Sequence, residues 1–218
     1  MSITRFCATD RIADEAGVCW ALRSNDAIVW VMRNFISYKK SERYFNDIVS
    51  GRSGIDLRER NIVVYDRICT QHRLIGFAAA RAGLQYRYSG TSIASQVWPD
   101  WMADLCAEVN AETGTSFNSV LINYYRDGRD YISAHSDDER MLGDNNAVAA
   151  IALGPGAWQR PLVFRPRKGC VGDVVEVEMP PGALLVTAGN TQNNYTHEML
   201  KQQGVMPRMS FTFRSILN

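Results

Sequence analysis

The 218-residue chain lacks several features that would place it in a special class of protein. No apolar run approaches the roughly 20 residues that a membrane-spanning helix needs, so we expect no association with a membrane. The first ten residues have no apolar core of the kind that a secretory signal requires, which favours an intracellular address. No repeat or low-complexity segment is evident. We therefore expect one domain over residues 1–218, acting as a monomer.

Cysteine pairs are also missing, and histidine is scarce. The five cysteines are odd in number, scattered and without a CxxC motif, so neither a disulfide framework nor a zinc knuckle is indicated. The chain has three histidines, namely His72, His135 and His197. Any site that depends on histidine must be built from these three side chains.

There is little net charge, but the total of +1 hides an uneven distribution. Residues 1–100 carry 14 Lys and Arg against 10 Asp and Glu, whereas residues 101–218 carry 10 against 13. If the partner is a polyanion, the N-terminal part should contact it. A normally solvated surface with a mild gradient explains the same numbers equally well.

The pattern of the first half favours helices beside an isolated strand. Residues 27–32 form an apolar run typical of a buried strand, and residues 41–49 have the apolar stripe of a short helix, which Ser41 could cap. A clearer helix begins near Pro99 and stops at Gly114.

Beyond Gly114 the pattern changes to short strands at close spacing. A hairpin is expected first, with a turn at Asp127-Gly128 between residues 117–125 and 131–137. Six further short strands follow, at residues 147–153, 161–165, 174–178, 183–187, 195–197 and 208–214. This order predicts an α+β fold that is mainly β: a double-stranded β-helix, or jelly roll, with N-terminal helices packed on one sheet.

The spacing of His135 and Asp137 suggests a metal site. Side chains two apart on a strand leave the sheet on the same side, so one imidazole and one carboxylate project together. A third ligand from a distant strand would complete a facial triad for a divalent metal. His197 lies one strand before the end of the chain and could reach the pair, whereas His72 has no matching partner. A lone histidine is nevertheless more often structural than a ligand.

The last strand has two chemically different faces. A period of two places its apolar side chains on one face and its polar ones, Arg208, Ser210, Thr212 and Arg214, on the other. Burying two arginines is costly unless an anion meets them, and guanidinium groups bind carboxylates in a bidentate manner. The pattern fits a dicarboxylate cosubstrate, although an edge strand with a wet polar face would look the same.

Taken together, these motifs resemble one known family. The segment NxYxDGxDxIxxHxDDE, a distal histidine and RxxxTFR, in this order, are similar to the AlkB family of iron(II) and 2-oxoglutarate-dependent dioxygenases, and most of all to its animal-type DNA repair branch. The resemblance covers roughly residues 65–216. The first 60 residues are much less informative.

The resemblance implies a cofactor, a cosubstrate and a role for individual residues. His135, Asp137 and His197 would hold Fe(II) within a jelly-roll core at about residues 117–216. The residues that would bind 2-oxoglutarate are Asn123, Tyr125, Arg208, Ser210, Thr212 and Arg214, with Arg208 on the far carboxylate and Arg214 nearer the metal. Ser210 departs from the family, which often has asparagine there.

The resemblance also implies a lid that recognises a nucleotide, at about residues 65–92. Residues 67–92 have the less regular pattern that suits such a segment. Tyr88 would stack on a flipped base and Glu139 would read its edge, with further substrate contacts from Tyr86, Arg87 and Ser89. Tyr86 and Tyr88 could equally be core residues of a strand.

The function implied is oxidative demethylation of N-alkylated bases, such as 1-methyladenine and 3-methylcytosine, in DNA or RNA. Such an enzyme consumes O2 and 2-oxoglutarate and releases succinate, CO2 and formaldehyde. Two alternatives stay open: a 2-oxoglutarate-dependent hydroxylase or demethylase that acts on a protein or small molecule, and a non-catalytic jelly-roll binding module.

Overall fold

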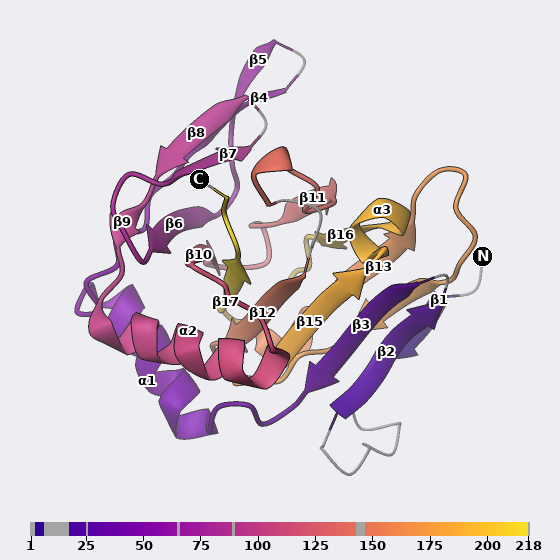
Figure 1. Cartoon of the computed structure of the whole chain (residues 1–218), viewed down its shortest axis with the longest axis horizontal. Helices are drawn as coiled ribbons and strands as arrows, with labels where there is room; N and C mark the ends of the chain where they lie inside the picture. Colours follow the sequence, from indigo (N-terminus) through magenta and orange to yellow (C-terminus); the bar gives the residue numbers. More distant parts are fainter. Residues whose placement is uncertain are drawn as a thin grey trace.

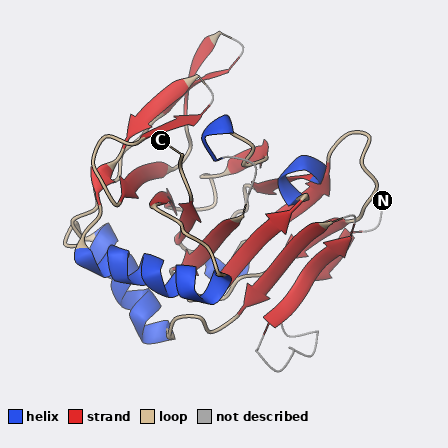
Figure 2. Cartoon of the chain, in the orientation of Figure 1, coloured by secondary structure: helices blue, strands red, loops and turns tan. Residues whose placement is uncertain are grey.

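Two facing β-sheets form the body of the molecule, with helices along one side (Figures 1 and 2). The computed structural model describes residues 3–6, 18–24, 26–64, 66–88, 90–142 and 147–217. Ser89 of the expected lid lies outside the described residues. The mainly β architecture with helices packed on one sheet confirms the fold class expected from the sequence.

The larger sheet supplies one wall of the molecule. Among the described residues it contains eight strands, in the spatial order β2 (Val18–Ser24), β3 (Ala27–Met32), β15 (Leu184–Gly189), β12 (Val148–Leu153), β17 (Arg208–Arg214), β10 (Ser119–Tyr125), β6 (Leu74–Ala79) and β9 (Gln96–Val97). Its central strands alternate between two faces, because apolar side chains face the helices and the polar side chains of β17 face the second sheet.

The smaller sheet faces the first one. In the described part of the chain its five strands follow the order β1 (Ile3–Phe6), β14 (Val174–Val177), β13 (Leu162–Pro166), β16 (Tyr195–Met199) and β11 (Ile132–His135). Buried side chains of β13, β14 and β16 pack against β3 and β15 of the larger sheet and close one end of the roll. The other end stays open as a pocket lined by both sheets.

The prediction of a hairpin around Asp127-Gly128 is wrong, because the two strands that flank this turn do not pair with each other. The strand before the turn, β10, pairs with β6 and β17 in the larger sheet, whereas β11 pairs with β16 in the smaller one. The connection crosses between the sheets and is held by Asp130, whose carboxylate accepts hydrogen bonds from the backbone and side chain of Arg126 at 2.8–2.9 Å. At Gly128 a Cβ atom would overlap the carbonyl oxygen of Gln202, so this crossing requires glycine.

Both expected helices are present and cover the outer face of the larger sheet (Figure 2). Helix α1 (Tyr38–Val49) buries Tyr44, Phe45 and Ile48, and helix α2 (Asp100–Thr113) ends at Gly114, which is left-handed at φ 65°. Shorter helical turns are α3 (Thr191–Asn194), η1 (Arg140–Leu142) and η2 (Ala157–Gln159). No helix in the described part of the chain is long and apolar enough to cross a membrane.

The start of α1 differs from the expectation. Ser37, not Ser41, is the N-cap, and its hydroxyl accepts a hydrogen bond from the Lys40 amide at 3.2 Å. Ser41 lies inside the helix and is fully buried. The helix starts earlier because Tyr38 and Lys39, which are exposed, and the half-buried Lys40 complete its first turn without contributing to the apolar stripe.

The segment at residues 67–92 is more regular than its sequence suggested. Two short hairpins, β4 (Asn61–Val64) with β5 (Arg67–Thr70) and β7 (Gln85–Tyr88) with β8 (Thr91–Ala94), project from the body of the molecule (Figure 1). Residues of β7 and β8 line the pocket. Strand β6 belongs to the larger sheet, where it pairs with β10. The two hairpins are therefore joined to the larger sheet through β6, which lies between them in the sequence.

The two serines of α1 give a test of its N-terminus. We expect Ser37→Ala to lower the free energy of unfolding by about 1 kcal/mol, because the cap bond to the Lys40 amide is lost. Ser41→Ala should be neutral or stabilising, since the buried hydroxyl of Ser41 has no hydrogen-bond partner among the described residues. Urea unfolding of both variants measures the difference, and a greater loss in Ser41→Ala would contradict the assignment.

Candidate active site

Two histidines and one aspartate meet at the open end of the roll. The antiparallel register of β11 and β16 places His135 directly opposite His197, with ring centroids 4.3 Å apart. Asp137 follows β11 by two residues, and its carboxylate oxygens lie 4.0 Å from Nε2 of His135 and 3.9 Å from Nε2 of His197. The three possible ligand atoms lie within 4.8 Å of one another, so a single metal ion could bind all three.

The protonation of the triad suits a metal. Nδ1 of His135 lies 2.8 Å from the carbonyl oxygen of Ser133, which can only accept, so Nδ1 carries the proton and Nε2 is the ligand atom. Burial lowers the pKa of His135, and burial together with the neighbouring His135 lowers the pKa of His197 to about 3. Both imidazoles are therefore neutral at pH 7, which is the form that binds metals.

Asp137 is held by an arginine from the opposite sheet. Nη2 of Arg214 donates to Oδ1 of Asp137 at 2.7 Å, and both side chains are buried. Burial alone would raise the pKa of Asp137, but the guanidinium of Arg214 is the main cause that lowers it to about 2. Nε and Nη1 of Arg214 have no partner among the described residues, so they can still donate to a ligand.

Arg208 is a buried cation without a counterion. Its side chain is 1% exposed and, in the part of the chain that the structure describes, forms no ion pair. Nη1 donates to the Arg160 carbonyl at 3.0 Å, while Nε has no partner in the described part of the chain. Burial lowers its pKa to about 10. Because an unpaired buried charge is costly, this guanidinium fits the far carboxylate of a keto acid.

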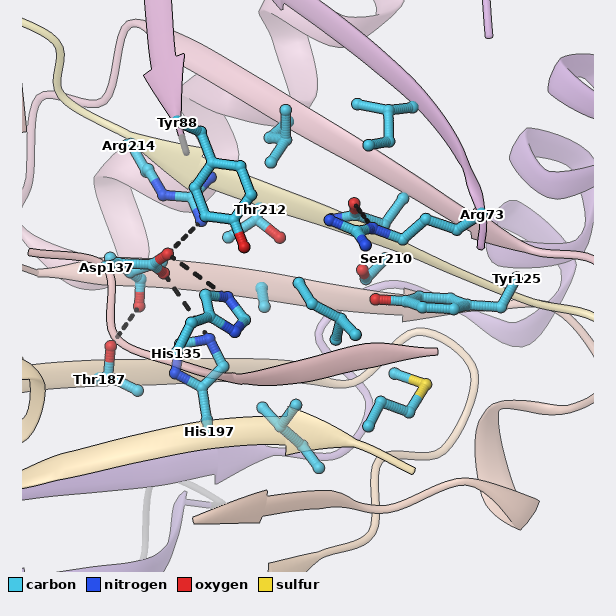
Figure 3. A pocket seen from close by; sticks show the side chains of 18 of the residues that line it. Arg73, Tyr88, Tyr125, His135, Asp137, Thr187, His197, Ser210, Thr212 and Arg214 are labelled. Carbon is cyan, nitrogen blue, oxygen red and sulfur yellow. Dashed lines mark hydrogen bonds and ion pairs between the residues drawn. The ribbon is translucent and has the colours of Figure 1, made fainter. Parts of the chain in front are cut away.

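The other expected cosubstrate residues line the same pocket. Its wall includes Asn123 and Tyr125 from β10, and Ser210 and Thr212 from β17. Figure 3 shows the triad and Arg214 on one side of the pocket and Tyr125 and Ser210 on the other. A ligand could therefore extend from the triad toward Arg208. The structure brings together every residue that the sequence assigned to metal and cosubstrate.

The lid residues differ in how they face this pocket. Tyr88 lines it and meets the ring of His135 edge to face, with centroids 6.2 Å apart. Tyr86 also lines the pocket but is a core residue at the same time, at 3% exposure. Arg87 points away on the exposed face of β7. Tyr88 is therefore a pocket residue, and Tyr86 is a residue of both the pocket and the core.

Glu139 is bonded to the lid residue Tyr86. Its Oε1 accepts a hydrogen bond from the Tyr86 hydroxyl at 3.0 Å, while its Oε2 is buried without a partner in the described chain. Burial, helped by nearby Asp137, raises the pKa of this carboxyl group. Oε1 of Glu139 is thus already bonded to Tyr86. That Glu139 reads the edge of a base stays a prediction, and it requires the base to reach Oε2.

Sequence reasoning missed several polar residues of the pocket wall, of which Arg73 and Gln192 bond to residues that it did assign to the site. Gln192 is 1% exposed; its Oε1 accepts from the backbone amide of Asp137 at 2.9 Å and its Nε2 donates to Oγ1 of Thr187 at 2.9 Å. It therefore holds the backbone of a candidate metal ligand. Helix α3, which carries it, has only four residues and so produces no periodic pattern that could have revealed it.

With its candidate ligands at the open end of a jelly roll, the protein falls in the class of mononuclear metal-dependent oxygenases. The model of the 2OG-Fe(II) oxygenase superfamily matches residues 28–214. The chain belongs to this superfamily.

Curated relatives support the resemblance to AlkB. The human DNA oxidative demethylase ALKBH2 is 34% identical over 144 residues, which are 62% of this chain and 54% of the relative. The human alpha-ketoglutarate-dependent dioxygenase alkB homolog 3 is 27% identical over 225 residues, covering 98% of this chain and 76% of the relative. The resemblance to the AlkB family that the sequence motifs indicated is confirmed. The chain spans 50–59% of the length of the mammalian ALKBH2 relatives.

Solved structures agree with the fold. OsALKBH1 matches with a TM-score of 0.61 at 12% identity, covering 90% of this chain and 100% of that chain. An oxidoreductase of the 2OG-Fe(II) oxygenase family from Burkholderia pseudomallei matches with a TM-score of 0.58 at 16% identity, over 100% and 99% of the two chains. At these identities the likeness concerns the fold alone.

Gln192 should affect metal binding. Gln192→Ala leaves the Asp137 amide without its acceptor, so we expect affinity for Mn(II), a redox-stable substitute for Fe(II), to fall about 10- to 100-fold. Asn193→Ala, on the exposed side of the same helix, is the matched control. Calorimetric titration measures both, and unchanged affinity in Gln192→Ala would exclude a positioning role.

Proposed function

We propose that this protein is an Fe(II)- and 2-oxoglutarate-dependent enzyme that demethylates N-alkylated bases, of the 1-methyladenine and 3-methylcytosine type, in DNA or RNA. The observation that carries the proposal is that one pocket contains a candidate metal triad and a buried arginine that has no counterion among the described residues. The relatives named DNA oxidative demethylase support nucleic acid as the substrate.

The binding of the cosubstrate follows from the charges of the pocket. Arg208 would bind the far carboxylate of 2-oxoglutarate, and Tyr125, buried against the same slot, would add a hydroxyl. Arg214 would keep Asp137 oriented while its free N–H groups face the near end of the ligand. His135, Asp137 and His197 would hold the iron.

The substrate would enter between the lid and the triad. A base inside a duplex must be flipped out before its methyl group can reach the pocket, and an aromatic ring can then hold it by stacking. Tyr88 offers such a ring directly above His135. The exposed Arg87, on the opposite face of the same strand, would contact phosphate outside the pocket.

In the proposed reaction the bound groups carry out the oxidation, and the protein positions them. Iron, O2 and the keto acid supply the oxidation of the N-methyl group to a hydroxymethyl group, which leaves as formaldehyde, while 2-oxoglutarate becomes succinate and CO2. The protein positions both ligands and excludes water. Apolar side chains such as Leu121, Ile132 and Leu185 line the pocket and keep it dry.

Formaldehyde release tests the reaction. We expect release from oligonucleotides that contain 1-methyladenine or 3-methylcytosine only when Fe(II) and 2-oxoglutarate are both present. His135→Ala should abolish it, because the triad loses one of its two imidazoles. Methylated single-stranded DNA, duplex DNA and RNA, assayed side by side, rank the substrates.

The third histidine provides the control for this test. His72 has an exposed side chain that stacks on Tyr131 and lies outside the triad, so His72→Ala should keep the wild-type rate. Full activity in His135→Ala would exclude the metal site. Turnover of 2-oxoglutarate that no methylated oligonucleotide stimulates would instead favour an oxygenase acting on a protein or small molecule.

Tyr88 should distinguish substrate binding from cosubstrate turnover. We expect Tyr88→Ala to lower kcat/KM for methylated oligonucleotides about 5- to 150-fold, which corresponds to the roughly 1–3 kcal/mol of one stacked base. Substrate-free turnover of 2-oxoglutarate should stay unchanged, and Tyr88→Phe should keep most of the activity. Tyr38→Ala, which removes an exposed tyrosine of α1, is the control. Wild-type kcat/KM in Tyr88→Ala would place the base elsewhere.

A further inference from the structure

Arg73 is a charged residue of the pocket wall to which the reaction described above assigns no role. It precedes β6, is 5% exposed and lines the pocket. Its Nε donates to Oδ1 of Asn123 at 2.8 Å, and its Nη1 makes a long contact of 3.5 Å with the carbonyl oxygen of Tyr131. Within the described residues it forms no ion pair. In Figure 3 its guanidinium reaches into the pocket beside Ser210 and Tyr125.

The bond to Asn123 determines how the amide of Asn123 is turned. A guanidinium has only donors, whereas an asparagine amide has one accepting oxygen and one donating NH2 group. The oxygen must therefore face Arg73. The NH2 group is then directed away from Arg73, and in the described chain Nδ2 has no protein partner. Asn123 also lines the pocket, so this donor is available to a ligand there.

We infer that Arg73 is a positioning residue that fixes the amide of Asn123 with its NH2 group toward the keto acid. The inference rests on the proposed use of 2-oxoglutarate as cosubstrate. Asn123 lies on β10 opposite Ser210 of β17, on the wall that leads to Arg208. A donor at this point can bond to a carboxylate, whereas a flipped amide would present its oxygen and repel it.

A positioning role and a purely electrostatic role of Arg73 predict different results, and three substitutions separate the two roles. Gln has its Nε2 at the same number of bonds from the backbone as Nε of Arg, so Arg73→Gln keeps the donor but removes the charge. Arg73→Met removes both at similar length. Arg73→Lys keeps the charge, but its nitrogen lies one bond further out and cannot replace Nε.

The experiment measures binding of 2-oxoglutarate to the Mn(II)-loaded protein by calorimetry. We expect Arg73→Met to weaken binding on the order of 10- to 100-fold, and Arg73→Gln to stay within a few-fold of wild type. Mn(II) affinity, measured separately, should not change in either variant. Arg58→Met removes an exposed arginine that pairs with Asp56 and controls for loss of charge near this sheet.

The outcomes are distinct. Equal losses in Arg73→Gln and Arg73→Met would show that charge alone matters and would overturn the inference, as would wild-type affinity in Arg73→Met. If Arg73→Met does not fold, the comparison of Arg73→Gln with Arg73→Lys replaces it: positioning predicts tighter binding by the Gln variant, and charge the reverse. Wild-type protein that binds Mn(II) but not 2-oxoglutarate would overturn the proposed cosubstrate and this inference with it.

Discussion

The register between β11 and β16 is the constraint on which the site depends. It places His135 opposite His197, and a slip of one residue would turn one of the two imidazoles to the far side of the sheet. The larger sheet then contributes through Arg214, which reaches across to the carboxylate of Asp137. A candidate metal ligand beside one sheet is thus oriented by a charge from the other. The site exists only when both sheets are assembled.

Buried positive charge is the second organising feature. Arg208 and Arg73 are both buried in the pocket wall without a carboxylate partner among the described residues, and only Arg214 has one, in Asp137. Such an arrangement lowers the stability of the ligand-free protein, because each guanidinium loses its hydration. An anionic cosubstrate recovers part of that cost on binding. The proposed dianionic cosubstrate would therefore offset a cost that the buried arginines impose on the fold.

The lid is in direct contact with the metal site. The Tyr86 hydroxyl bonds to Glu139, and the guanidinium of Arg214 lies 5.3 Å from the centre of the Tyr86 ring. Since Arg214 also pairs with Asp137, Tyr86 is linked to this candidate metal ligand through a single side chain. Tyr88, on the same hairpin, contacts His135. Any movement of the hairpin on substrate binding would therefore alter the surroundings of the triad.

The sequence by itself determined the features that depend on local period and order. Alternation along residues 208–214 separated the arginines from the core side chains, and the spacing of His135 and Asp137 predicted that both side chains leave the sheet on the same side. The order of the short strands predicted the roll. The motif resemblance to the AlkB family then supplied His197 as the third ligand, which spacing alone left open.

Only the tertiary structure decided what depends on contacts between distant segments. It assigned β10 and β11 to different sheets, because a turn sequence shows where the chain bends but not which partner each strand finds. It revealed Gln192 and Arg73, whose roles come from single hydrogen bonds to Asp137 and Asn123, 55 and 50 residues away in sequence. Such bonds leave no periodic trace along the chain, because one polar side chain is enough to make each of them.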